Sequence, residues 1–363
     1  MIHLQSCHTA GRCRYNVDRT EFDHNSSEND RVSVMRRPEV RKWKFLPTVI
    51  LCLAMCGEFF FVGCKKRTTS SGESKQTSTT NQVVSKPVIY TSFYPMQYFT
   101  KRIAGDFAKV VCPVPSDADP IFWQPSRKVI AEFQNADLII LNGAEYEKWV
   151  LTTALPDDRV IRTARPLADS YITFKTTTHS HGLTGKHTHQ GIDGHTWMDP
   201  VNAKIQANEI LEALKDRYAD HSEPLPSNFK SLAVDLDALK GRFEEITQKL
   251  DGCMIICSHP AWNYVARRYG WTIHNLALDP AGIPTDKELA SLTELTKGHR
   301  GLKIVLWESE PISETADLLR NRFGIISITF SPCETLNDSD RENGINYISV
   351  MNANLDRLEA ALP

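Results

Sequence analysis

Short apolar runs alternate with amphipathic stretches along most of the chain from Pro87 onward. In the first half this alternation predicts helical material at 127–136 and strands at 88–93, 109–114, 137–143 and 159–163. It returns after residue 252, where we expect helices at 261–270, 286–298 and 313–323 and strands at 253–259, 271–278, 302–308 and 325–330. Strands that alternate with helices imply a mostly parallel sheet. The pattern therefore predicts two α/β lobes.

A long stretch with the apolar periodicity of a helix lies between the two predicted lobes. Six apolar residues recur at alternating spacings of four and three, which places them on one face of a helix: Leu232, Leu236, Leu239, Phe243, Ile246 and Leu250. A helix from Ser227 to Leu250 is about 36 Å long at a rise of about 1.5 Å per residue. The periodicity leaves two interpretations open, namely a strut that joins the lobes and a helix packed wholly within one of them.

The N-terminal region has the order of a secretory signal. Basic residues at 36–44 precede a largely apolar run at 45–62. Cys64 follows this run in a context that resembles a bacterial lipobox, so we expect export to the periplasm or cell envelope and a lipid anchor on Cys64. Phe61 stands where leucine is usual and Glu58 interrupts the apolar run, so a retained membrane anchor is the alternative.

These patterns divide the chain into six segments. Met35 is a candidate start, and the stretch after Cys64 is rich in serine, threonine and lysine without apolar periodicity. We expect a non-structural extension at 1–34, a signal and lipobox segment at 35–64, a disordered tether at 65–86, a first lobe at 87–224, a linking helix at 225–251 and a second lobe at 252–363.

Composition excludes some classes of function. A chain of 363 residues with 41% apolar and 24% charged residues is typical of a globular protein large enough for two domains. The net charge is only −2 and no sustained basic stripe is present, so no nucleic-acid partner is expected. The cysteines do not form a disulfide framework. Cys253 and Cys257 lie on one face of a predicted strand, too far apart to bridge, and are interpreted as buried.

Histidines concentrate in one short stretch. Five of the twelve lie between Thr178 and Trp197: His179, His181, His187, His189 and His195. Neutral imidazole is the commonest protein ligand for zinc, so this stretch is a candidate metal site. Its glycines predict a mobile loop over 178–195 rather than a strand or helix. A solvated polar loop without a metal is the alternative.

Two histidines stand at places where α/β folds bind ligands. His195 occurs in HTWMDP, and Asp199 and Pro200 of that motif predict the start of a helix. His259 occurs in CSHPAWNYVARRYG, between a predicted strand and the next helix. Both lie on the crevice side of their sheets. One histidine from each lobe predicts a site between the lobes.

The region from Pro87 to Pro363 resembles the cluster A-I metal-binding proteins of bacterial ABC importers, which are extracytoplasmic receptors for zinc, manganese or iron. The resemblance rests on the ordered motifs TSFYPMQYF, NADLIILNGAEYEKW, HTWMDP, SHPAWNYVARRYG, DPAGIPTDKELASLTELTK and LWESEP. It implies an α/β fold of two lobes with mostly parallel sheets, joined by one long rigid helix, with the metal between the lobes.

The resemblance also implies a ligand set. Members of the family usually hold the metal with a histidine in the first lobe, a histidine in the HxW motif, a residue in a GHPA-like motif and a carboxylate in the last lobe. The second and third carry over to His195 and His259. Ile121 of DPIFWQPS and Ser331 of FSPCE stand at the other two positions. Two of the four family ligand positions are therefore substituted.

Several residues are candidates to replace the missing ligands. The pairs His179/His181 and His187/His189 rank first, because imidazole suits a zinc site that has lost a histidine. Glu308 of LWESEP offers a carboxylate, either as a ligand or as an acid that supports one. Asp119 lies two residues before Ile121.

The expected function follows from the resemblance. We expect a monomeric, non-enzymatic receptor that captures zinc, with manganese or iron as alternatives, and delivers it to the permease of an ABC importer. Two other functions remain open: an envelope zinc buffer or chaperone that acts through the histidine-rich loop, and a diverged binding protein for another ligand. A zinc hydrolase is disfavoured, because the chain contains no HExxH-type motif.

Overall fold

The structure, a computed structural model, describes residues 85–181 and 185–363. All of these residues belong to one compact unit. The expected extension, the signal segment, Cys64 and nearly all of the tether lie outside the described residues. Within the described residues, no helix has the length and apolar character needed to cross a membrane.

The first lobe is built on a parallel sheet of four strands in the order β2-β1-β3-β4. Ile89 of β1 is paired with Leu138 of β3, and Ile139 of β3 with Val160 of β4. The strands are β1 (Val88–Thr91), β2 (Lys109–Val111), β3 (Leu138–Leu141) and β4 (Val160–Arg162). The helices of this lobe are α1 (Tyr94–Ala104), α2 (Arg127–Asn135) and α3 (Pro200–Arg217). Asp199 caps α3 by accepting a hydrogen bond from the Val201 amide, as predicted.

The second lobe repeats the architecture with the order β10-β9-β7-β8, again all parallel. Its strands are β7 (Met254–Cys257), β8 (Ile273–Asn275), β9 (Lys303–Trp307) and β10 (Ile325–Thr329). Its helices are α5 (Asn263–Tyr269), α6 (Asp286–Thr296), α7 (Ser313–Phe323), α8 (Asp338–Glu342) and α9 (Tyr347–Ala360). The predicted α/β fold with two mostly parallel lobes is confirmed.

Each sheet separates two apolar layers, because alternate side chains of a strand point to opposite faces. In β3, Leu138 and Ile140 enter a core shared by both lobes, whereas Ile139 and Leu141 pack in an outer cluster of the first lobe. In β9, Ile304 and Leu306 enter the same shared core, and Val305 and Trp307 pack in an outer cluster of the second lobe. One apolar core therefore runs through both lobes.

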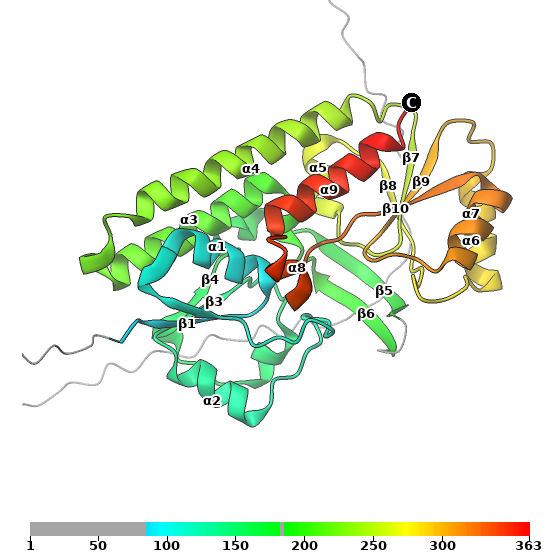
Figure 1. The fold of residues 1–363 in the computed structure, drawn as a ribbon. Coiled ribbons are helices and arrows are strands. Elements are labelled where there is room, and N and C mark those ends of the chain that lie inside the picture. The colour runs from blue at the N-terminus through cyan, green and yellow to red at the C-terminus, as the bar shows by residue number, and fades with distance from the viewer. Residues whose placement is uncertain (1–84, 182–184) are drawn as a thin grey trace, which may run out of the picture. The chain divides into compact units, whose positions relative to one another are not determined.

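The long helix α4 (Leu225–Thr247) lies along this shared core. It packs against α1 and α3 of the first lobe and against α5 and α9 of the second, as Figure 1 shows. Its predicted apolar face is buried, and it ends three residues before the expected Leu250. Of the two interpretations left open by the periodicity, the helix that joins the lobes is the one observed.

The histidine-rich segment is not the mobile loop that its glycines predicted. Its backbone forms the antiparallel pair β5 (Thr173–His181) and β6 (Gly185–Ile192), with His179 paired with His187. Threonine-rich sequence favours strands, and two of the glycines lie at the first and next-to-last positions of β6, where they interrupt little pairing. The side chains at 175–190 lie outside the description, so metal binding by the four hairpin histidines stays a prediction.

Candidate metal centre

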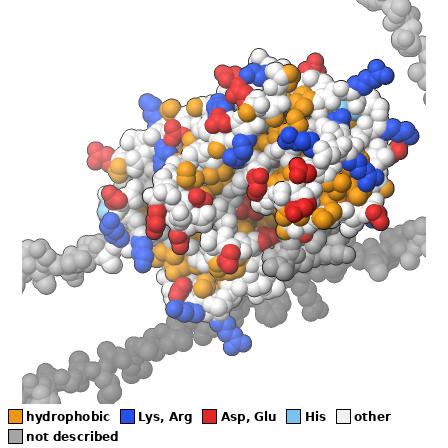
Figure 2. Space-filling view, turned by 45° about the vertical axis from the view of Figure 1, so that its right-hand side comes forward, with side chains coloured by type: hydrophobic (Ala, Val, Ile, Leu, Met, Phe, Trp, Pro, Cys, Tyr) orange, Lys and Arg blue, Asp and Glu red, His pale blue; other side chains and the backbone are white. Residues whose placement is uncertain are grey.

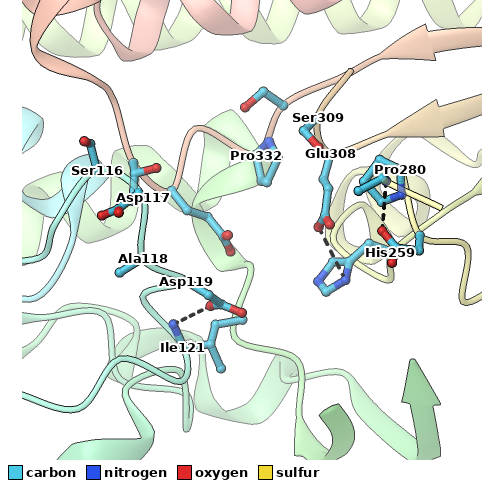
Figure 3. Close-up of a pocket in the computed structure, with 15 residues that line it drawn as sticks. Ser116, Asp117, Ala118, Asp119, Ile121, His259, Pro280, Glu308, Ser309 and Pro332 are labelled. Carbon is cyan, nitrogen blue, oxygen red and sulfur yellow. Dashed lines mark hydrogen bonds and ion pairs between the residues drawn. The ribbon is translucent and has the colours of Figure 1, made fainter. Parts of the chain in front are cut away.

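A cleft of about 420 Å³ lies at the carboxyl ends of the strands of both lobes. Figure 3 shows Asp119 and Ile121 of the first lobe on one wall, and His259 and Glu308 of the second lobe on the opposite wall. His259 follows β7 and Glu308 follows β9, which is where parallel α/β sheets bind ligands. The cleft is therefore the place predicted for a ligand between the lobes.

The lining of the cleft is acidic. Its carboxylates come from five residues of both lobes: Asp117, Asp119, Asp279, Glu308 and Glu334. No lysine or arginine is among its described lining residues. Acidic side chains also gather on the face shown in Figure 2. A concave surface with one sign of charge concentrates counter-ions, so this cleft favours cations over anions.

His195 is held in one orientation by Asp193. The Asp193 Oδ1 atom accepts a hydrogen bond from the His195 amide at 3.0 Å and contacts its Nδ1 at 2.8 Å. Asn263 of the second lobe donates to Asp193 Oδ2 at 2.9 Å, and Tyr264 donates to the Asp193 carbonyl at 2.8 Å. Because Nδ1 is engaged by a carboxylate, Nε2 is the nitrogen available to a metal.

Glu334 is a carboxylate of the candidate site that the sequence reasoning missed. Its Oε1 lies 3.2 Å from the His195 Nε2. The chain reaches this place through a tight turn in which Cys333 has a φ of 58° and donates its amide to the Ser331 hydroxyl. The backbone amide of Tyr94 in the first lobe donates to the Glu334 carbonyl at 3.2 Å and so holds the turn in place.

Ser331, the predicted last-lobe ligand position of the family, lies in the same turn. The Ser331 side chain is engaged within the turn, and the acid that reaches His195 is three residues further along. The signal was present in FSPCETLN, whose single acidic residue is Glu334. Matching by position overlooked it, because the left-handed conformation of Cys333, with a φ of 58°, is not evident from the sequence.

The two carboxylates beside His195 keep the imidazole charged. Burial lowers the pKa of His195, but hydrogen bonds and charge from Asp193 and Glu334 outweigh burial and raise its pKa from 6.5 to about 10. His195 and Glu334 therefore form an ion pair in the metal-free protein at neutral pH. A divalent cation that binds Nε2 must displace its proton.

His259 is brought next to His195, as predicted. The two ring centroids are 5.3 Å apart and the rings are nearly perpendicular at 80°. The Ser258 amide donates to the Leu306 carbonyl, which extends the sheet to the residue before His259. Glu308, the residue after β9, places its Oε2 3.5 Å from His259 Nδ1, and Figure 3 shows its carboxylate directed toward the imidazole.

The described first-lobe residues that line the cleft, which lie between 116 and 121, include no histidine. Ile121 is 5% exposed and packs in the shared core, and its amide donates to Asp119 Oδ1 at 2.9 Å. Across the described residues, no three His, Cys, Asp or Glu side chains are arranged to hold a metal ion. His259 and Glu334 line the cleft, and His195 lies next to both of them.

Cys253 and Cys257 do not line the cleft. Cys257 is buried in β7 with its side chain in the shared core, and burial raises the pKa of its thiol. Cys253 is half-buried, and neither forms a disulfide. Both observations agree with their interpretation as structural residues.

Known proteins of similar sequence are zinc proteins by name. The chain is 29% identical over 318 residues to the zinc-binding lipoprotein AdcA of Streptococcus pneumoniae serotype 4, a match that covers 86% of this chain and 60% of that protein. This chain thus spans under two thirds of the length of that relative. It is 27% identical to the high-affinity zinc uptake system protein ZnuA of Bacillus subtilis, with 84% of this chain and 97% of that protein covered.

Solved structures share the fold. The Zn(II)-bound ZnuA-like domain of Streptococcus pneumoniae AdcA superposes with a TM-score of 0.64 and 27% identity, which covers 77% of this chain and 99% of that one. Residues 89–361 match the family described as zinc-uptake complex component A, periplasmic. This match takes in both lobes, α4, His195, His259 and Glu334. The chain belongs to the ZnuA family of zinc-uptake components.

Proposed function

We propose that the protein is the extracytoplasmic receptor of an ABC importer, which captures zinc between its lobes and delivers it to a membrane permease without catalysing a reaction. The proposed donors are His195, His259 and Glu334. The observation that carries the proposal is the pair of atoms His195 Nε2 and Glu334 Oε1, 3.2 Å apart and contributed by different lobes at an acidic cleft. The names of AdcA and ZnuA support zinc as the cargo.

The donor set suits reversible capture of zinc. Two imidazoles and one carboxylate match the nitrogen and oxygen ligands that zinc accepts, and they leave a fourth position without a protein ligand. Ile121 contributes no donor at this position. A site with three protein ligands and an open fourth position suits both capture and release of zinc, as delivery to a permease requires.

Calorimetric titration of metal-free protein with zinc tests the proposal. We expect about one tightly bound zinc per chain, and a loss of affinity of at least about 100-fold in His195→Ala and in Glu334→Gln, because each removes one of three ligands. The matched control is His221→Ala, a change at a histidine that stacks on Phe107 away from the cleft. Wild-type protein without bound zinc, or variants that bind as well as wild type, would overturn the proposal.

The partner and the anchor are also part of the proposal. The family description names a component of a zinc-uptake complex, which supports a permease partner. One of the relatives is named a lipoprotein, which supports a lipid on Cys64. Mass spectrometry of the protein from the membrane fraction tests the second point. A diacylated N-terminal Cys64 is expected, and an uncleaved N-terminal segment would show a retained anchor instead.

A further inference from the structure

Tyr146 brings an unused hydroxyl to the metal centre. The residue is 2% exposed, and its hydroxyl has no hydrogen-bond partner among the described residues. Its ring packs against Phe93 and Trp197, with centroid distances of 4.6 and 4.9 Å, and its centroid lies 6.1 Å from that of the His195 ring. Buried polar groups are nearly always paired in folded proteins, so an orphaned hydroxyl beside a metal ligand calls for a functional reason.

A strained turn places Tyr146 at this point. The three residues before it have positive φ, with 79° at Gly143, 50° at Ala144 and 58° at Glu145. The latter two are not glycines, so their conformation is costly and must be held by the surroundings. The buried carboxylate of Glu147 holds it, because it accepts hydrogen bonds from the Asn142 amide at 2.6 Å and from the Gly143 amide at 3.0 Å.

The other side of Tyr146 is in contact with the histidine motif. A Cβ atom at Gly194 would lie 2.9 Å from both Cβ and Cδ2 of Tyr146, which is closer than real side chains approach. Gly194 is the residue immediately before His195. The tyrosine is therefore packed directly under the backbone that carries a proposed zinc ligand, and its hydroxyl has little freedom to move elsewhere.

The hydroxyl faces the carboxylate of the second lobe. Burial raises the pKa of Tyr146 well above 10, and the charges of Glu334 and Asp119 raise it further. The phenol is therefore a protonated hydrogen-bond donor. It lies beside Glu334 without the alignment of a hydrogen bond, and Oε1 of Glu334 is buried and contacts His195 as an ion partner.

We propose that Tyr146 is a positioning residue for zinc, which donates its hydroxyl proton in a hydrogen bond to Glu334 and holds that carboxylate toward the metal. The inference rests on the proposed function. In the metal-free protein the His195 imidazolium faces Glu334. With zinc bound between His195 and Glu334, the neighbouring phenol would be a hydrogen-bond donor close to that carboxylate. It gives the first lobe a polar contact in a site where Ile121 has none.

Tyr146→Phe tests this role, because it removes one oxygen atom and keeps the ring that packs on Trp197. The change removes a hydroxyl without a partner in the metal-free protein, so the variant is expected to fold. Zinc affinity should fall about 10-fold, at the lower end of the loss that follows removal of a group supporting a metal ligand. The visible absorption of bound cobalt(II) should also shift, because the carboxylate changes its mode of coordination.

A double-mutant cycle separates positioning from a packing effect. In a Glu334→Gln background, Tyr146→Phe should change zinc affinity less than about 2-fold, because the hydroxyl acts through the carboxylate. Tyr269→Phe is the matched control, since its hydroxyl also lacks a hydrogen-bond partner among the described residues but its ring stacks on Phe243 in the second lobe. This control should bind zinc and cobalt(II) as wild type does.

The outcomes distinguish this inference from the function on which it rests. If wild-type protein binds no zinc, the proposed function fails. If wild type binds zinc and Tyr146→Phe binds it equally well, or loses the same affinity in both backgrounds, only the role of Tyr146 is overturned. If Tyr146→Phe lowers zinc affinity only when Glu334 is present, and also shifts the cobalt(II) spectrum, the positioning role of Tyr146 is established.

Discussion

At the scale of single residues, the metal centre depends on close packing behind the ligands as much as on the ligands themselves. Gly194 is the sharpest example, because the Tyr146 side chain occupies the space of its missing Cβ at 2.9 Å. Close-packed interiors do not absorb an added methyl group without displacement of a neighbour. The displaced neighbour here is the ring that supports His195 and faces Glu334.

Gly194→Ala is therefore expected to weaken zinc binding about 10-fold or more and to lower the free energy of unfolding by about 1–3 kcal/mol. The matched control is Gly241→Ala in the interior of α4, where an added Cβ meets nothing within 4 Å. This control should raise the free energy of unfolding by about 0.5–1 kcal/mol. Urea denaturation and zinc titration of both variants provide the measurements. Equal behaviour of the two alanine variants would contradict the packing argument.

The residue scale is also where the sequence was least informative. His195 and His259 were predictable, because each follows a strand or loop end in a recognisable motif. Glu334 was not, since its position depends on the left-handed conformation of Cys333, a residue type that seldom adopts it. Tyr146 was equally hidden. Its role depends on three consecutive positive φ angles and on Gly194, 48 residues further along the chain.

At the scale of elements, apolar periodicity predicted all eight strands of the two parallel sheets and the long helix α4. The hairpin β5–β6 escaped prediction, because its glycines were read as breaks in a polar segment. Strand pairing depends on a partner elsewhere in the chain, which a count of local residue types does not include. The antiparallel register pairs His179 with His187, so the histidines are arranged on a ribbon rather than on a flexible loop.

Shortening the hairpin tests whether it or the cleft holds the zinc. Removal of residues 178–188, with Thr177 joined to His189 by an Asn-Gly turn, keeps the strand pair at the base, because these two residues are paired in the register. We expect one tight zinc site to remain and any additional, weaker sites to disappear in a calorimetric titration. Loss of nearly all zinc binding would favour a zinc buffer that acts through the histidine-rich hairpin.

At the scale of the whole molecule, the two lobes are held together at the site from several directions. Trp197 Nε1 donates to the Pro332 carbonyl at 2.8 Å, and Tyr347 donates to the Trp197 carbonyl at 2.6 Å. On the other side of the site, Arg268 of the second lobe pairs with Asp199 of the first. These contacts join the element that carries His195 to the turn that carries Glu334, so the distance between the proposed ligands depends on both lobes together.

The shared core leads to a prediction about unfolding. Because α4 and one continuous apolar cluster serve both lobes, loss of either lobe exposes the buried surface of the other. The two lobes should therefore unfold in one cooperative transition. Zinc at about 100 times its dissociation constant should stabilise the folded protein as a whole by about 2.7 kcal/mol and move this single transition to a higher temperature.

Trp149 and Trp307 report on the two lobes separately, since each is buried in the outer cluster of a different lobe. With 5-fluorotryptophan incorporated, Trp149→Phe and Trp307→Phe assign the two fluorine resonances. Without zinc, we expect both native resonances to lose intensity at the same temperature. With zinc, both should again lose intensity together, at a higher temperature. A first-lobe resonance that melts apart from the second would show that α4 links two independent domains. In that case zinc would couple the lobes only by binding between them, and the two transitions should merge when the metal is added.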